Sequence, residues 1–295
     1  MKSFIKFMIR QIAYMRLRWL PLSEQQAEWW AEKMKRWPAF FAERPFVVER
    51  RVAHGARMTV GLIDVIERNL LVHGVWDEQV AEVMRTSIHP NTTVVDVGAN
   101  IGYFSLLASS LVGAHGRVLC IEPSHRNLSK LSGHLWQNKC SNTLILSVAA
   151  GQESGSAEIY FPTYNNAGAA TLRANPTTQP QHTLVLALDD IFEAHAVSPD
   201  FIKLDIEGFE LHALKGMERT LKRCAPVIVC ELSDSFLREI GQSASELVSY
   251  MEGLGYSCQS ISDSAGAPAG TKMSVATGNI HAGQIDVVFQ RTLQA

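Results

Sequence analysis

The sequence has no long uninterrupted run of apolar residues, which bears first on its relation to membranes. The most apolar N-terminal stretch, Phe4–Leu20, is interrupted by Lys6, Arg10, Arg16 and Arg18. A membrane-spanning helix needs about 20 consecutive apolar residues, so we expect none in this stretch. The same charges, and the lack of a small-residue cleavage site after them, argue against a secretory signal peptide.

Cysteine is scarce. The chain has 5 cysteines, an odd number, scattered along its length. None lies at zinc-ligand spacing from another cysteine or a histidine, so the sequence predicts no metal site of that kind. Free thiols persist most simply in a reducing compartment, and we expect a cytoplasmic protein.

The chain also has little net charge. Its formal charge of −2 indicates no general affinity for nucleic acid. Its 46% of hydrophobic residues suits a globular core. Its 295 residues suit one large domain, alone or with an extension.

What charge there is at the N-terminus follows a pattern. Lys2, Lys6 and Arg10 recur every four residues and share one helical face, while Phe4 and Met8 lie away from it. Tryptophans follow at positions 19, 29, 30 and 37. Such a basic amphipathic helix can lie on an anionic membrane as a peripheral contact. It can equally pack on the main domain or in the interface of a homo-oligomer, and the sequence leaves both interpretations open.

Three segments are expected. Residues 1–44 form an amphipathic, Trp-rich helical extension, and residues 45–90 hold lead-in strands and a helix, with a hairpin near His54-Gly55. In residues 91–295, strands and helices alternate, which predicts an α/β fold with a mostly parallel, doubly wound sheet. Its expected strands are Thr93–Val97, Arg117–Glu122, Thr143–Ala149, Phe201–Ile206 and Val227–Glu231, with short edge strands at Ser156–Phe161 and Leu184–Leu188 and a last strand at Gln284–Gln290. Its expected helices are Gly102–Leu111, His125–Asn138, Phe209–Lys222 and Ser243–Leu254.

The turn after the first of these strands is the strongest sign of a ligand. It carries Gly98 and Gly102, and a helical pattern follows, which is how doubly wound folds hold nucleotide-like ligands. Asp96 precedes the turn, where a carboxylate repels a pyrophosphate but can hold an ammonium group. Glu122 ends the next strand about twenty residues on, at the spacing of a ribose-binding acid. The pattern favours S-adenosylmethionine over a dinucleotide.

A second signal lies in the stretch from Phe201 to Glu210. Lys203 and Asp205 point to the same side of their strand, and Glu207 follows in the turn. Asp205 and Glu207 are candidates to contact the acceptor, and one of them could accept a hydroxyl proton. For Lys203, a structural ion pair competes with a catalytic role. Carboxylates here could also hold Mg²⁺, but methyl transfer from a sulfonium needs no metal, so none is predicted.

These motifs resemble one known family. The segments VDVGANIGYFSLL from Val95, Glu122-Pro123, Leu188-Asp189-Asp190 and IKLDIEGFE from Ile202 are similar to the FkbM family of S-adenosylmethionine-dependent methyltransferases. The likeness spans roughly residues 54–232. It implies a Rossmann-like methyltransferase fold and O-methylation of a hydroxyl on a sugar, glycolipid or secondary metabolite.

The resemblance also implies residue roles. Asp96, Gly98, Asn100 and Gly102 would line the methionine end of the cofactor, Glu122 its ribose, and the strand ending at Ala149 its adenine. Two rival functions remain: an NAD-dependent oxidoreductase, which Asp96 and Asn100 argue against, and a non-catalytic binding protein with the same fold.

Overall fold

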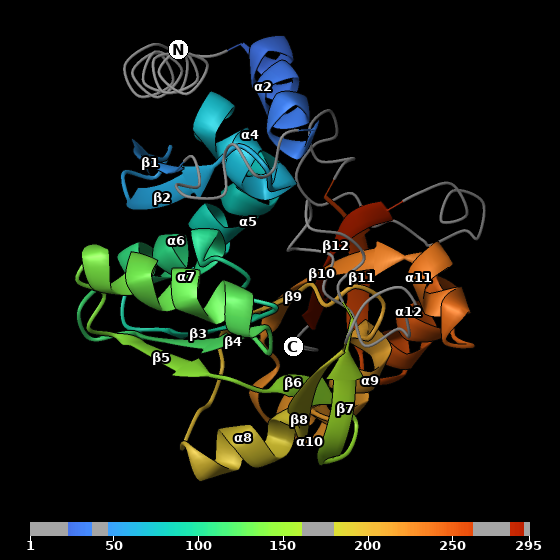
Figure 1. The fold of residues 1–295 in the computed structure, drawn as a ribbon. Coiled ribbons are helices and arrows are strands. Elements are labelled where there is room, and N and C mark those ends of the chain that lie inside the picture. The colour runs from blue at the N-terminus through green and yellow to red at the C-terminus, as the bar shows by residue number, and fades with distance from the viewer. Residues whose placement is uncertain (1–22, 37–46, 161–179, 262–283, 292–295) are drawn as a thin grey trace, which may run out of the picture. The chain divides into compact units, whose positions relative to one another are not determined.

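The computed structural model describes residues 23–36, 47–160, 180–261 and 284–291 (Figure 1). The chain divides into two compact units, each described here by itself. Residues 1–76 with 163–167 form the first, and residues 77–162 with 168–295 form the second. The division at residues 44 and 90 remains a prediction. Three stretches lie outside the described residues, namely the basic segment 4–20, most of residues 162–180, and residues 262–283.

The first unit contains a hairpin and helices. Strands β1 (Val47–Arg51) and β2 (Arg57–Gly61) pair antiparallel, and Gly55 turns the hairpin with a φ of 89°, where the sequence predicts it. The helices are α2 (Glu24–Arg36) and α4 (Val65–His73). Asp64 caps α4 by accepting hydrogen bonds from the first-turn backbone.

The second unit is built on a seven-stranded sheet of order β11-β12-β10-β9-β3-β4-β5. Its strands are β3 (Thr93–Val97), β4 (Arg117–Ile121), β5 (Thr143–Leu146), β9 (Phe201–Leu204), β10 (Val227–Ser233), β11 (Tyr256–Ser260) and β12 (Gln284–Arg291). The pairs from β10 through β9, β3 and β4 to β5 are parallel, whereas β12 is antiparallel to both β10 and β11. The predicted mostly parallel sheet is confirmed.

Helices cover both faces of this sheet. They are α5 (Glu78–Ser87), α6 (Tyr103–Val112), α7 (His125–Gln137), α8 (Leu188–Ala194), α9 (Glu210–Lys215), α10 (Glu218–Cys224), α11 (Asp234–Glu239) and α12 (Ala244–Gly253). In Figure 1, α6 and α7 lie on one side of β3, β4 and β5, and α8 lies on the other. Within the described ranges, no helix is long and apolar enough to cross a membrane.

The side chains of β3 alternate between the two faces of the sheet. Val95 and Val97 belong to the main apolar core together with Ile191 of α8. Asp96 lies between them and points to the opposite face, where the Ser105 hydroxyl of α6 donates a hydrogen bond to it at 2.6 Å. Asp96 is therefore a buried polar group on the α6 side of the sheet, where apolar residues such as Val94 are buried as well.

Three expected elements differ in the structure. The predicted strand Thr143–Ala149 ends at Leu146, and Ala149–Gly151 forms β6 in a separate three-stranded sheet with β8 (Gln181–Ala187) and β7 (Gly155–Ile159). In that sheet β8 is central, so its prediction as an edge strand is wrong. The predicted helix Phe209–Lys222 is two helices, α9 and α10. It breaks at Gly216, where a Cβ would lie 2.0 Å from the carbonyl oxygen of Gly151.

Candidate functional site

The turn between β3 and α6 has backbone conformations that few residues adopt. Gly98 and Gly102 have φ values of 80° and 91°, and Asn100 has a φ of 49°. A Cβ on Gly98 would lie 1.9 Å from the carbonyl oxygen of Asp205. The Asp205 amide in turn donates to the Val97 carbonyl at 3.1 Å. The turn after β3 is therefore packed directly on the end of β9, and only glycine fits at position 98.

The same turn has unused hydrogen-bonding capacity. Helix α6 begins after Gly102, and no side chain caps its first turn. The Asn100 Oδ1 is buried and has no hydrogen-bond partner within the described part of the chain. Buried polar atoms are normally paired, so both features fit a polar ligand at this turn.

Glu122, at the end of β4, ties two turns together. Its Oε2 accepts a hydrogen bond from the Asn100 amide at 2.8 Å, and its Oε1 accepts one from the Ser124 amide, also at 2.8 Å. Asn127 Nδ2 donates to Oε1 at 3.4 Å. Burial raises the pKa of Glu122 to about 7, although the backbone donors from Ser124 and Asn100 favour the anion. This carboxylate fixes the turn after β3 against the turn after β4.

A buried lysine lies between two acids on the α6 side of the sheet. Lys203 Nζ is 3.0 Å from Asp205 Oδ2 and 3.9 Å from Asp96 Oδ1, and it lies 5.0 Å from the ring centroid of Phe104. Burial would lower the pKa of Lys203, but the charges of Asp205 and Asp96 outweigh it and raise the pKa. Burial raises the pKa of Asp96, although the charge of Lys203 and the hydrogen bond from Ser105 act to lower it. The predicted pairing of Lys203 with Asp205 is thus present.

The turn after β9 is shaped by an acid further along the chain. Glu207 has a φ of 56° and Gly208 a φ of 101°. Glu210 Oε1 accepts hydrogen bonds from the Gly208 amide at 3.0 Å and the Ile206 amide at 3.1 Å. Glu210 is 1% exposed, so it braces the Asp205–Glu207 turn from within. Burial raises the pKa of Glu210 to about 7.

Further carboxyl groups continue the row of acids formed by Glu122, Asp96 and Asp205 at the ends of the strands. Glu231 on β10 is opposite Asp286 on β12, and the charge of Asp205 on β9 acts on Glu231. Asp286 shares a side-chain hydrogen bond with Asp77, the residue that precedes α5. Sequence analysis missed Asp77 and Asp286. The alternation of the last strand could have signalled Asp286, but its pairing with β10 could not be known from the chain.

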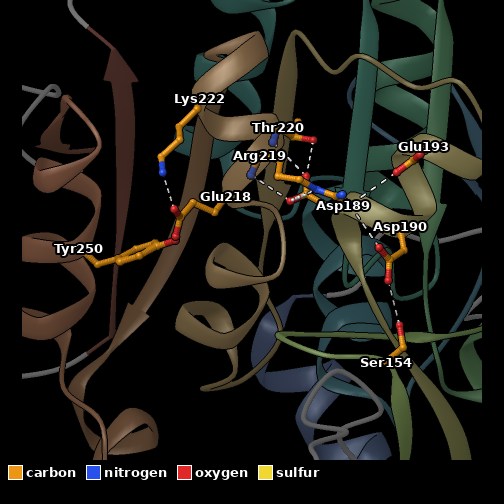
Figure 2. Close-up of polar contacts among 9 residues, drawn as sticks. All are labelled: Ser154, Asp189, Asp190, Glu193, Glu218, Arg219, Thr220, Lys222 and Tyr250. Atoms are coloured by element: carbon orange, nitrogen blue, oxygen red, sulfur yellow. Dashed lines mark hydrogen bonds and ion pairs between the residues drawn. The ribbon is translucent and has the colours of Figure 1, made fainter.

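Two sequence-predicted features lie apart from this row. Ala149 is buried on β6 and pairs with Val185 of β8 in the separate sheet. Asp189 accepts hydrogen bonds from the Arg219 and Thr220 amides at the start of α10, each at 2.9 Å (Figure 2). The Leu188–Asp190 motif is therefore a structural cap and ion-pair cluster.

Among the residues that the structure describes, no group of three or more His, Cys, Asp or Glu side chains is arranged to hold a metal ion. The acids from Glu122 to Asp286 form a rim of buried and partly buried carboxyl groups around one lysine. Such a rim suits a ligand with cationic and hydroxyl groups rather than a polyanion.

The chain is similar in sequence to known methyltransferases. The model of the methyltransferase FkbM domain matches residues 96–258, which is more than half of the 295-residue chain. The hexuronic acid methyltransferase AglP of Haloferax volcanii is 27% identical over 178 residues, which cover 60% of this chain and 70% of that protein.

Solved structures of methyltransferases are also similar. A methyltransferase FkbM from Methylobacillus flagellatus KT has a TM-score of 0.44 at 19% identity, covering 88% of this chain and 60% of that chain. A putative rRNA methylase from Clostridium thermocellum has a TM-score of 0.45 at 10% identity, covering 74% of this chain and 96% of that chain. Assignment to a family rests on the domain match alone.

Proposed function

We propose, from the premise that this chain belongs to the FkbM family of methyltransferases, that it methylates a hydroxyl group of a sugar unit. S-adenosylmethionine is the methyl donor, and it supplies an activated methyl group whose C–S bond breaks as a C–O bond to the acceptor forms. The sugar is proposed because the relative AglP is a hexuronic acid methyltransferase.

The donor end of the site is assigned to the turns after β3 and β4. The uncapped start of α6 and the unpaired Asn100 Oδ1 support this assignment, because both suit the polar amino-acid end of the cofactor. Asp96 Oδ1 has no hydrogen-bond partner among the described residues and is assigned to the ammonium group. Gly98 and Gly102 let the backbone come close to the ligand.

Glu122 is assigned to the ribose of the cofactor, but not as a carboxylate that accepts hydrogen bonds from two ribose hydroxyls. An ionised carboxylate accepts about four hydrogen bonds. Backbone and side-chain donors from Asn100, Ser124 and Asn127 already occupy most of this capacity. Glu122 therefore positions both turns and contributes at most one strong contact to a ribose hydroxyl. Ala149 remains a proposed neighbour of the adenine.

The acceptor end is assigned to Asp205 and Glu207. The Asp205 side chain is 35% exposed, so it is the accessible member of the Lys203 ion-pair group. We assign to Asp205 or Glu207 the acceptance of the hydroxyl proton as the C–O bond forms. Lys203 is a positioning residue that holds the Asp205 carboxylate in place.

The observation that carries the proposal is the direct contact between Gly98 and Asp205. This contact joins the donor turn to the acceptor turn, as alignment of a methyl group with an oxygen requires. An NAD-dependent dehydrogenase has no such need for an acid before its glycine turn, and nothing in the site favours it.

The first test is titration calorimetry with S-adenosylmethionine and NAD. We expect micromolar or tighter binding of S-adenosylmethionine and no binding of NAD; comparable binding of NAD would overturn the assignment.

The second test is single-turnover methyl transfer by Asp205→Asn and Glu207→Gln. Loss of a general base slows a reaction by about 10²–10⁴-fold. We expect this loss in one variant with cofactor affinity preserved, and parent rates in both would remove these residues from catalysis.

Location and assembly are separate proposals. We place the protein in the cytoplasm, with the basic segment 4–20 serving either as a peripheral membrane contact or as a packing or oligomer contact. Deletion of residues 1–20 distinguishes the two. Loss of salt-sensitive binding to anionic liposomes supports the first, and a changed oligomeric state supports the second.

A further inference from the structure

The carboxyl groups beyond Asp205 have no role in the function proposed so far. Glu231 and Asp286 are opposite each other on β10 and β12, at the same edge of the sheet as the end of β9. In the sheet order, β10 is the first strand and β12 the second strand beyond β9, on the side opposite to β3 and β4. Neighbouring strands lie about 4.8 Å apart, so the Glu231–Asp286 pair adjoins Asp205 on the side away from the turns after β3 and β4.

A buried oxygen in this cluster lacks a partner. Glu231 is 7% exposed, and its Oε2 has no hydrogen-bond partner within the described ranges. Its Oε1 accepts a hydrogen bond from Gln284 Nε2. The charges of Asp205, Glu207 and Asp286 all act on Glu231, which places its carboxyl group among them. A buried carboxyl oxygen without a donor is uncommon in a folded protein and fits a hydroxyl of a bound ligand.

The electrostatics of the cluster indicate which ligand fits. Burial, and then the charge of Asp205, raises the pKa of Glu231 well above its ordinary value, and burial and Asp77 raise the pKa of Asp286. A carboxyl group that holds a proton can both donate to and accept from hydroxyl groups. An incoming carboxylate would instead meet the Asp205 and Glu207 acids at close range.

We propose that Glu231, Asp286 and Asp77 form the acceptor subsite, and that this subsite selects an uncharged, hydroxyl-bearing sugar over a sugar acid. The inference rests on the proposed methyl transfer to a sugar and specifies its substrate class. It separates this chain from its relative AglP, whose name states a hexuronic acid. A sugar acid would bring its carboxylate to the rim that carries Asp205 and Glu207, and this like-charge repulsion should give a preference on the order of ten- to a hundredfold for the neutral sugar.

The test uses the full chain, a tritiated methyl donor and a glycan extract from source cells that lack the gene. Labelled product is treated with mild alkali, which releases methanol from methyl esters but leaves methyl ethers intact, and is then hydrolysed to monosaccharides. We expect alkali-stable label in an O-methyl ether of a neutral sugar. Alkali-labile label, label on a uronic acid or label on nitrogen would each overturn the proposal. Cofactor binding without any transfer to glycans would overturn the proposed function itself, and the subsite with it.

Variants test the subsite separately from the reaction. Glu231→Gln and Asp286→Asn keep side-chain shape, and each should slow transfer to the neutral acceptor by about ten- to a hundredfold while cofactor affinity stays within about twofold. Asp190→Asn removes the same charge in the remote cluster of Figure 2 and should leave the rate unchanged. The melting temperatures of the three variants, compared with that of the parent, show whether each variant folds. Parent rates in both Glu231→Gln and Asp286→Asn would refute the subsite and leave the methyltransferase intact.

Discussion

Glu210 offers a quantitative test of the turn that carries Asp205 and Glu207. Burial raises its pKa from 4.5 to about 7 in the folded protein. A carboxyl group whose folded pKa exceeds its unfolded pKa stabilises the fold below the unfolded value, and this contribution is lost as the pH rises through the folded value. The shift corresponds to about 3 kcal/mol of stability lost between pH 4.5 and pH 7.

Glu210→Gln should remove this pH dependence. The amide oxygen of glutamine can still accept the hydrogen bonds from Ile206 and Gly208, but it cannot ionise. Relative to the parent, the variant should therefore gain stability as the pH rises from 5 to 8, by most of that amount. Using the difference between the two proteins cancels the contribution of Glu122, which titrates in both.

The assay is urea unfolding of parent and variant at half-unit steps from pH 5 to pH 8. Glu218→Gln is the matched control, because a hydrogen bond from Lys222 lowers the pKa of Glu218 and moves its titration below this range. The difference between parent and Glu218→Gln should be constant across the series. A constant difference for Glu210→Gln as well would refute the inference that burial raises the pKa of Glu210.

Four further predictions follow from the site and its supports. Gly98→Ala should abolish cofactor binding in calorimetry, because its Cβ meets the Asp205 carbonyl. Gly113→Ala has open space around the added Cβ, so it should show only the cost of a backbone conformation that glycine alone adopts readily (φ 70°, ψ −170°), about 1–3 kcal/mol in urea unfolding. Asp189→Ala should lower stability by about 0.5–2 kcal/mol through loss of the α10 cap and leave turnover per folded enzyme unchanged. Glu122→Ala should weaken cofactor binding about ten- to a hundredfold in calorimetry, the worth of a charge-assisted hydrogen bond, and parent affinity would exclude Glu122 from the ribose contact. Methyl transfer should survive EDTA, and loss of activity restored by Mg²⁺ would place a metal among the rim acids.

Local sequence was enough to predict the parts of the fold with strong patterns. Thr93–Val97 is a strand with the predicted bounds, because an apolar β-branched run ended by a glycine turn has few alternatives. The Lys203–Asp205 pair followed from the two-residue period of a strand. Both predictions used residues that are neighbours along the chain.

What sequence could not predict depends on contacts between distant segments. Position 216, where the predicted helix is interrupted, has to be glycine because the backbone of Gly151, far away in sequence, comes too close for a side chain. The carboxylate of Glu210, at the start of α9, folds back onto the preceding turn, and nothing in the local sequence indicates that contact. Asp286 gained its place opposite Glu231 only through the pairing of β12 with β10. In each case tertiary packing decided the outcome.

The order of strands in the sheet has a consequence for synthesis of the protein. β11 precedes β12 in the chain, yet β12 lies between β10 and β11 and is the strand that pairs with both. As the polypeptide emerges from the ribosome, β3, β4, β9 and β10 can assemble first, whereas β11 cannot join the sheet until β12 is available to pair with it. The nascent chain would thus expose the free edge of β10 until residues 284–291 arrive. We expect chains truncated before β12 to be held by chaperones or to aggregate, because the edge of β10 then stays unpaired.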